Sequence, residues 1–84
     1  GEGYQLIRDG STAINGRIPV NTGGGLVGFG HPVGATGVKQ ILEIYRQMKG
    51  LCGDYQMPTL PNVGLTANMG GNDKTVVTSI FRNA

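Results

Sequence analysis

Apolar residues recur at helical spacing in one stretch of the chain. Between Val33 and Lys49 they fall on one face of a helix with 3.6 residues per turn, namely Val38, Ile41, Leu42, Tyr45 and Met48, with Ile44 widening that face. Lys49 followed by Gly50 is typical of a helix C-terminus. The pattern predicts a helix over Val33–Lys49, with Lys39 and Glu43 paired on its solvent side.

The last third of the chain has the β-branched composition of strands. Val63–Ala67 and Lys74–Phe81 are separated by a turn at Asn68–Asp73, which predicts an antiparallel hairpin. Arg17–Asn21 is predicted to be a short extended segment, and Pro19 keeps it at the edge of a sheet or at the end of a strand. The predicted order is strand, glycine-rich loop at 22–37, helix and two-stranded hairpin. This is an α/β arrangement within 1–84, a single partial domain.

Glycine is in large excess, at 16 of 84 residues. The glycines have no period of three, which excludes collagen, and a quarter of the residues are Ile, Leu, Val or Phe, which disfavours disorder. A chain of this length has a small core, and its single cysteine excludes an internal disulfide. It begins at Gly1 without a signal-peptide pattern, so we expect a piece of a larger cytoplasmic protein. A eukaryotic source would allow a peroxisomal or mitochondrial one.

The charge pattern argues against a nucleic-acid partner. Net charge is +2, and the seven basic residues are spread along the chain among only five aromatic ones. A nucleic-acid site needs a basic stripe or a stacking platform. No apolar run is long enough for a membrane span, so a membrane partner is not expected either.

Seven glycines lie between Gly23 and Gly37, and Gly23–Gly28 satisfies the spacing G-x-G-x-x-G. A dinucleotide site also needs a helix opening directly on the last glycine and an acidic residue about 20 positions later. His31-Pro32 interrupts the first requirement, and Glu43 lies inside the predicted helix. A dinucleotide site is therefore disfavoured, and a P-loop is excluded because no Gly-Lys-Ser/Thr occurs.

His31 is the single histidine, and most such residues are structural or solvated. This one lies between Gly30 and Pro32, just before a helix N-terminus whose N–H groups suit an oxyanion or thioester oxygen. An imidazole there can donate to that oxygen or act as a base.

Cys52 follows the predicted helix and is interpreted as a small buried apolar residue. The helix C-terminus beside it would raise the pKa of a thiol, which does not suit a nucleophile. The segment Asn68-Met69-Gly70-Gly71-Asn72 is interpreted as a hairpin turn, or as a tight loop that presents backbone N–H groups.

The segment from Asn21 to Gly37 resembles the Gly-His-Pro block of the thiolase family. That block reads Asn-x-x-Gly-Gly, then Gly-His-Pro-x-Gly-Ala-Thr-Gly, then an amphipathic helix. The resemblance extends from about residue 16 to the end of the chain. It is closest to the branch of sterol-carrier-protein-type thiolases and acetyl-CoA acetyltransferases, and it identifies a C-terminal fragment.

The resemblance implies part of a layered α/β fold and acyl transfer between CoA thioesters and a cysteine nucleophile. His31 matches the family's Gly-His-Pro histidine, which helps activate that nucleophile and lines an oxyanion hole. Gly70 matches a glycine that supplies a backbone N–H to an oxyanion. The coenzyme A thioester is the substrate, and no cofactor or metal is implied. The implied partner is the N-terminal thiolase half, in a parent that forms a homodimer or homotetramer.

Two departures from the family pattern matter. The nucleophilic cysteine belongs to the absent N-terminal half, so we expect the isolated fragment to be inactive. Asn68 stands where a Cys-x-Gly loop carries the acid/base cysteine, and an amide cannot exchange protons as a thiol does. Three hypotheses remain: a thiolase fragment; a thiolase-like protein that binds CoA or lipid thioesters or performs retro-aldol cleavage; and an unrelated small binding module.

Overall fold

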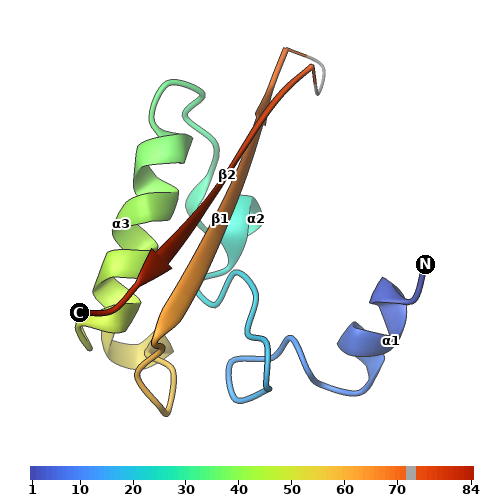
Figure 1. Ribbon diagram of the computed structural model, residues 1–84, viewed down its shortest axis with the longest axis vertical. Helices are drawn as coiled ribbons and strands as arrows, with labels where there is room; N and C mark the ends of the chain where they lie inside the picture. The colour runs from blue at the N-terminus through green and yellow to red at the C-terminus, as the bar shows by residue number, and fades with distance from the viewer. Residues whose placement is uncertain (72–73) are drawn as a thin grey trace.

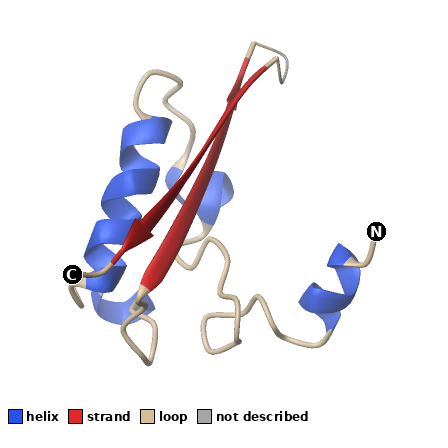
Figure 2. Ribbon diagram, in the orientation of Figure 1, coloured by secondary structure: helices blue, strands red, loops and turns tan. Residues whose placement is uncertain are grey.

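The computed structural model describes residues 1–71 and 74–84. Three helices come first, α1 (Gly3–Arg8), α2 (Gly25–Phe29) and α3 (Thr36–Met48). A short 3-10 turn, η1 (Gly53–Tyr55), then leads to strands β1 (Val63–Gly70) and β2 (Thr75–Arg82). Figures 1 and 2 show α3 running beside the hairpin, with α1 set apart near the N-terminus. The predicted α/β fold class, with one long helix before a C-terminal hairpin, is confirmed.

Helix α3 begins at Thr36, three residues later than predicted. The carbonyl oxygen of Pro32 accepts hydrogen bonds from the N–H groups of Ala35 (2.8 Å) and Thr36 (3.0 Å), so 33–35 form a turn that leads into the helix. Gly34 in this turn disfavours regular helix. The predicted C-terminus is nearly correct, because Lys49 caps the helix and Gly50 follows with φ +71°. None of the described helices is long and apolar enough to cross a lipid bilayer.

The predicted antiparallel hairpin is confirmed, with its strands in register from Val63 opposite Arg82 to Gly70 opposite Thr75. The prediction that the turn begins at Asn68 is wrong, because residues 68–70 continue β1. Their partners are residues 75–77, which are β-branched and favour a longer ladder over the turn preference of Asn and Gly. Asn72 and Asp73, the end of the predicted turn, lie outside the described residues.

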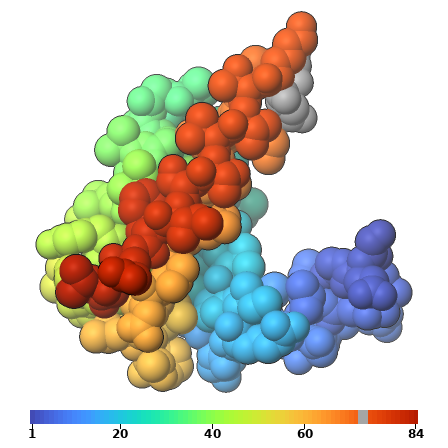
Figure 3. Space-filling view, viewed as in Figure 1, coloured from blue at the N-terminus to red at the C-terminus, as the bar shows by residue number. Residues whose placement is uncertain are grey.

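The segment before α2 differs from the prediction. Residues 17–21 form no strand in the described part of the chain. Instead, Ile18 and Val20 donate backbone hydrogen bonds to the carbonyl oxygens of Ser11 (2.9 Å) and Thr12 (3.1 Å). Pro19 between them has no N–H, so the pairing does not extend into a ladder. The space-filling view shows the N-terminal arm standing away from the rest of the molecule (Figure 3).

Helix α3 has three sides with different surroundings. Ile44 and Met48 face the hairpin, and a second side carries Thr36, Glu43 and Gln47 toward the glycine-rich segment. Residues on the third side remain largely exposed, among them Val38, Leu42 and Tyr45. Met48 and Cys52 are the only buried apolar side chains in the described residues, so the core is as small as the length predicts.

Close contact between α3 and the hairpin depends on Gly64. A Cβ atom added there would lie 2.5 Å from Ile44 Cγ2 and 3.3 Å from Met48 Cε. Ile44 is β-branched and stiff at χ1, so it cannot swing away from an added methyl group. Glycine at this position therefore sets how closely the helix and the sheet approach.

We expect Gly64→Ala to lower the melting temperature of the full-length protein by several degrees. Overpacking of this kind costs about 1–3 kcal/mol. Gly70→Ala is the matched control on the same strand, because nothing lies within 4 Å of its added methyl group. Thermal unfolding of both variants checks the expectation. Equal melting temperatures would show that the helix and the hairpin do not pack this closely.

Candidate functional site

The segment that carries His31 is more ordered than predicted. Residues 25–29 of the predicted irregular loop form the short helix α2. Gly30 ends this helix by donating its N–H to the carbonyl oxygen of Leu26 (2.8 Å). Its φ of +84° is a value that glycine adopts without strain, and it turns the chain toward His31.

The exposed ring of His31 is held by Thr36, in the first turn of α3. Thr36 Oγ1 lies 2.7 Å from His31 Nδ1 and 3.2 Å from the carbonyl oxygen of Pro32. The hydroxyl has a single proton and a carbonyl oxygen only accepts, so we assign that proton to the Pro32 bond. Nδ1 then carries a proton that it donates to Thr36. In the neutral ring, the lone pair is left on Nε2, the nitrogen that can act as a base.

Thr36 is a residue of the candidate site that the sequence pattern does not predict. It is part of the Gly-His-Pro block, but no role was predicted for it. Its side chain is 7% exposed, which is unusual for a threonine at a helix start. The available signal was its position, five residues after His31 and in the first helical turn, where a hydroxyl can reach back.

Gln47 holds the beginning of the same segment. It is 5% exposed, and its Nε2 donates to Thr22 Oγ1 (3.0 Å) and to the carbonyl oxygen of Tyr55 (2.8 Å). Its Oε1 accepts from the N–H of Met57 (3.0 Å). A buried amide with these partners is fully used in structure. The glycine-rich segment is therefore tied to α3 at Thr22 as well as at His31.

Asn68 lies beside the start of α3. A Cβ atom added to Gly37 would be 2.5 Å from Asn68 Nδ2, so the glycine makes room for this side chain. A shallow cavity of about 370 Å³ separates the helix from the hairpin here, lined by Val33, Gly34, Gly37, Val38, Gln40, Ile41, Thr66, Asn68, Val77 and Ser79. The cavity thus brings Asn68 together with the turn that follows His31.

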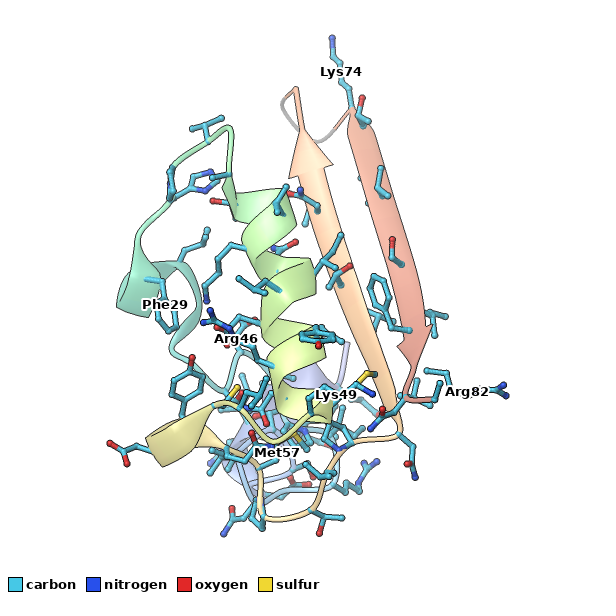
Figure 4. All side chains as sticks on the ribbon, turned by 90° about the vertical axis from the view of Figure 1, so that its left-hand side faces the viewer. Phe29, Arg46, Lys49, Met57, Lys74 and Arg82 are labelled. Carbon is cyan, nitrogen blue, oxygen red and sulfur yellow. The ribbon has the colours of Figure 1, made fainter. Side chains whose placement is uncertain are left out.

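Gly70 and His31 do not line this cavity. Gly70 is exposed at the end of β1, opposite Thr75. Figures 1 and 4 show that β1 ends at the same end of the molecule as the loop before α3, with α3 between that loop and the hairpin in Figure 4. The end of β1 that carries Gly70 and the turn before α3 thus lie on the same side of the molecule, and the oxyanion role of Gly70 stays a prediction.

Cys52 is buried, as the sequence predicts. Burial, followed by the nearby Glu43 carboxylate, raises the pKa of its thiol, so the unreactive protonated form is favoured. In the part of the chain that the structure describes, no group of three His, Cys, Asp or Glu side chains is placed to hold a metal ion.

Comparison with known proteins shows the family of this chain. Residues 1–83 match the family model described as thiolase C-terminal domain-like. The chain is 44% identical over 81 residues to an acetyl-CoA acetyltransferase of Methanothermobacter thermautotrophicus, covering 96% of this chain and 21% of that protein. It is 39% identical over 71 residues to benzoylsuccinyl-CoA thiolase subunit BbsB of Thauera aromatica, covering 84% and 18%. The chain belongs to the thiolase family.

Human sterol carrier protein 2 is a further relative, 38% identical over 78 residues, which cover 93% of this chain and 14% of that protein. The predicted resemblance to the branch with acetyl-CoA acetyltransferases and sterol carrier proteins is thus confirmed. The chain spans about a fifth or less of the length of these three relatives.

We expect Thr36→Val to disturb the tautomer of His31 without moving the backbone, because valine has the shape of threonine but no hydroxyl. The neutral Nδ1–H form should lose roughly 3–10-fold in population, as loss of one neutral hydrogen bond implies. Thr36→Ser keeps the acceptor and should keep the tautomer. Nitrogen NMR of the labelled full-length protein measures both forms, with the His31 signals identified by their loss in His31→Gln. Identical spectra for the Val and Ser variants would contradict the assignment.

Proposed function

We propose that this chain is the C-terminal portion of a thiolase-type acyltransferase that acts on acyl-CoA thioesters, by cleaving a 3-ketoacyl-CoA or condensing two acetyl-CoA molecules. The observation that carries the proposal is the His31–Thr36 pair. It holds one imidazole at the turn before α3, with Nε2 available as a base. Membership of the thiolase family supports the reaction class.

In the proposed reaction, His31 Nε2 takes the proton of a cysteine thiol that another part of the parent chain supplies. In the condensation direction, the thiolate attacks the thioester carbonyl of one acyl-CoA, and the intermediate expels the CoA thiolate, which takes the proton from Nε2 of the imidazolium. The acyl group stays on the cysteine until a second proton-transfer group removes a proton from the α-carbon of another acetyl-CoA. That carbon then attacks the acyl group and frees the cysteine thiolate, which is reprotonated by the same group; cleavage of a 3-ketoacyl-CoA is the reverse sequence.

While it is charged, the imidazolium of His31 donates its Nδ1–H to Thr36 Oγ1, and its Nε2–H can donate to the oxyanion. Gly70 contributes a backbone N–H to the oxyanion. The CoA thioester is the substrate, and no cofactor or metal takes part.

Asn68 restricts what this portion can contribute. A carboxamide does not release a proton near neutral pH, so Asn68 does not act as an acid or a base. The second proton-transfer group must come from elsewhere in the parent, which forms a homodimer or homotetramer. The same substitution supports an alternative function, a thiolase-like protein that binds CoA or lipid thioesters or performs retro-aldol cleavage. A nucleophilic cysteine in the rest of the parent distinguishes acyl transfer from this alternative.

We expect His31→Ala to lower kcat of the full-length protein by roughly 10²–10⁴-fold, because base and oxyanion donor are lost together. Acyl transfer from acetyl-CoA and thiolysis of a 3-ketoacyl-CoA are both measured. Thr59→Ala, an exposed change in the connector after η1, serves as the control and should keep wild-type turnover. A loss of less than a few-fold in His31→Ala would refute the catalytic role.

The isolated 84-residue chain should show no acyl transfer, because its single cysteine is buried and the proposed nucleophile lies elsewhere. Release of free CoA from acetyl-CoA, followed with a thiol reagent, measures this directly. Turnover by the purified chain that disappears in His31→Ala would contradict the proposal that the nucleophile is supplied from outside.

A further inference from the structure

Phe29 contacts α3 from the segment that carries His31. Phe29 is 46% exposed, which is less than its neighbours Val27 (100%) and Val33 (84%). The covered part of its side chain packs between two elements. Its ring centroid lies 3.4 Å from Lys39 Nζ on α3, and 6.1 Å from the ring of Tyr55 in η1 at an interplanar angle of 62°. Both geometries are favourable for an aromatic ring.

A carboxylate closes this contact into a ring of interactions. Glu43 Oε1 lies 3.1 Å from Lys39 Nζ and accepts a hydrogen bond of 3.2 Å from the Tyr55 hydroxyl. Burial and the Glu43 carboxylate raise the pKa of Tyr55, so its hydroxyl stays protonated as a donor. We call Phe29, Lys39, Glu43 and Tyr55 the Phe29 clamp. The Lys39–Glu43 pair predicted on the solvent side is formed, but it faces the loop, with side chains 35% and 18% exposed.

The Phe29 clamp and the hydrogen bond between Thr36 and His31 lie on the same side of α3. Thr36, Lys39 and Glu43 are spaced i, i+3 and i+7, which places them on one stripe of the helix. Thr36 contacts His31, and Lys39 contacts Phe29, which precedes His31 by two residues. Gly30 joins these two points with a positive φ, and nothing lies within 4 Å of a Cβ atom built on it. Glycine has more backbone conformations available than any other residue, so the direction in which the chain leaves α2 at Gly30 depends on how Phe29 and His31 are held.

We propose that the Phe29 clamp is a positioning device for the acyl-transfer reaction, which fixes the backbone before Gly30 so that His31 meets the nucleophile in the correct geometry. This inference rests on the proposed function. A catalytic group displaced by about 1 Å can lose 10²-fold in rate, so a loop with little apolar packing benefits from a second anchor. The four residues are positioning residues, because none of them needs to touch the substrate.

The test compares lysine variants in the full-length protein. Lys39→Met keeps the length of the side chain but removes the charge above Phe29 and beside Glu43, whereas Lys39→Arg retains it. Lys49→Met is the matched control, since Lys49 caps the same helix and its Nζ contacts Asn83 (3.0 Å), away from the clamp. We expect Lys39→Met to lower kcat by roughly 5–50-fold, with KM for the CoA thioester within about twofold. Lys39→Arg should regain most of kcat.

The melting temperature separates positioning from simple stabilisation. A positioning role predicts a lower kcat in Lys39→Met at a melting temperature close to that of Lys49→Met. If Lys39→Met loses kcat only together with stability, and arginine does not rescue it, the clamp is a structural contact and the inference is overturned. If Lys39→Met keeps kcat while His31→Ala is inactive, the clamp fails but the proposed function stands. If His31→Ala is itself active, the proposed function fails first.

Discussion

The site depends on the contact between the glycine-rich segment and one side of α3, the side that carries Thr36, Glu43 and Gln47. We call these three residues the polar stripe. Thr36 and Gln47 form hydrogen bonds to His31 and Thr22 of this segment. Glu43, on the same side of the helix, accepts a hydrogen bond from Tyr55, whose ring packs against Phe29. A glycine-rich chain has few side chains to bury, so apolar packing alone cannot fix its path. Hydrogen bonds from a rigid helix can, and they also set the direction of the His31 ring. Loop and helix therefore form one unit, although no sheet connects them.

Much of the architecture could be predicted from the sequence, because it follows from local patterns. The period of 3.6 located α3 to within three residues, and the β-branched run of 75–81 located β2. The prediction that Lys39 and Glu43 lie on the solvent side of the helix is wrong. Lys39 and Glu43 look like a solvated pair, and only the approach of Phe29 and Tyr55 turns them inward. Such an approach is tertiary and leaves no trace in periodicity.

The candidate site shows the same division. His31 could be identified from its neighbours and from the family motif, since Gly30 and Pro32 limit its backbone. Thr36 could not, because a hydroxyl in a first helical turn is common and only the fold brings it to 2.7 Å from the ring. Asn68 was assigned to a turn by its composition, but the opposing Val77 draws it into a strand and against Gly37. The role of a single side chain such as His31 was thus predictable from the sequence, whereas the contacts of Thr36 with His31 and of Asn68 with Gly37 were not.

The orientation of His31 is only as stable as the position of α3, because its side-chain hydrogen bond is to Thr36 of that helix. Polar contacts of the stripe contribute little net stability, since each replaces a hydrogen bond to water. The described residues bury only Met48 and Cys52 as apolar side chains, while Val38, Leu42 and Tyr45 on the third side of the helix remain more than 40% exposed. A monomeric protein seldom leaves so much apolar surface open. The chain spans about a fifth or less of its relatives' length, so a helix with one side for the loop, one for the hairpin and one still uncovered suits a larger layered body. Burial of that third side would hold α3 in place, and Thr36 would then hold the imidazole of His31 in a fixed orientation.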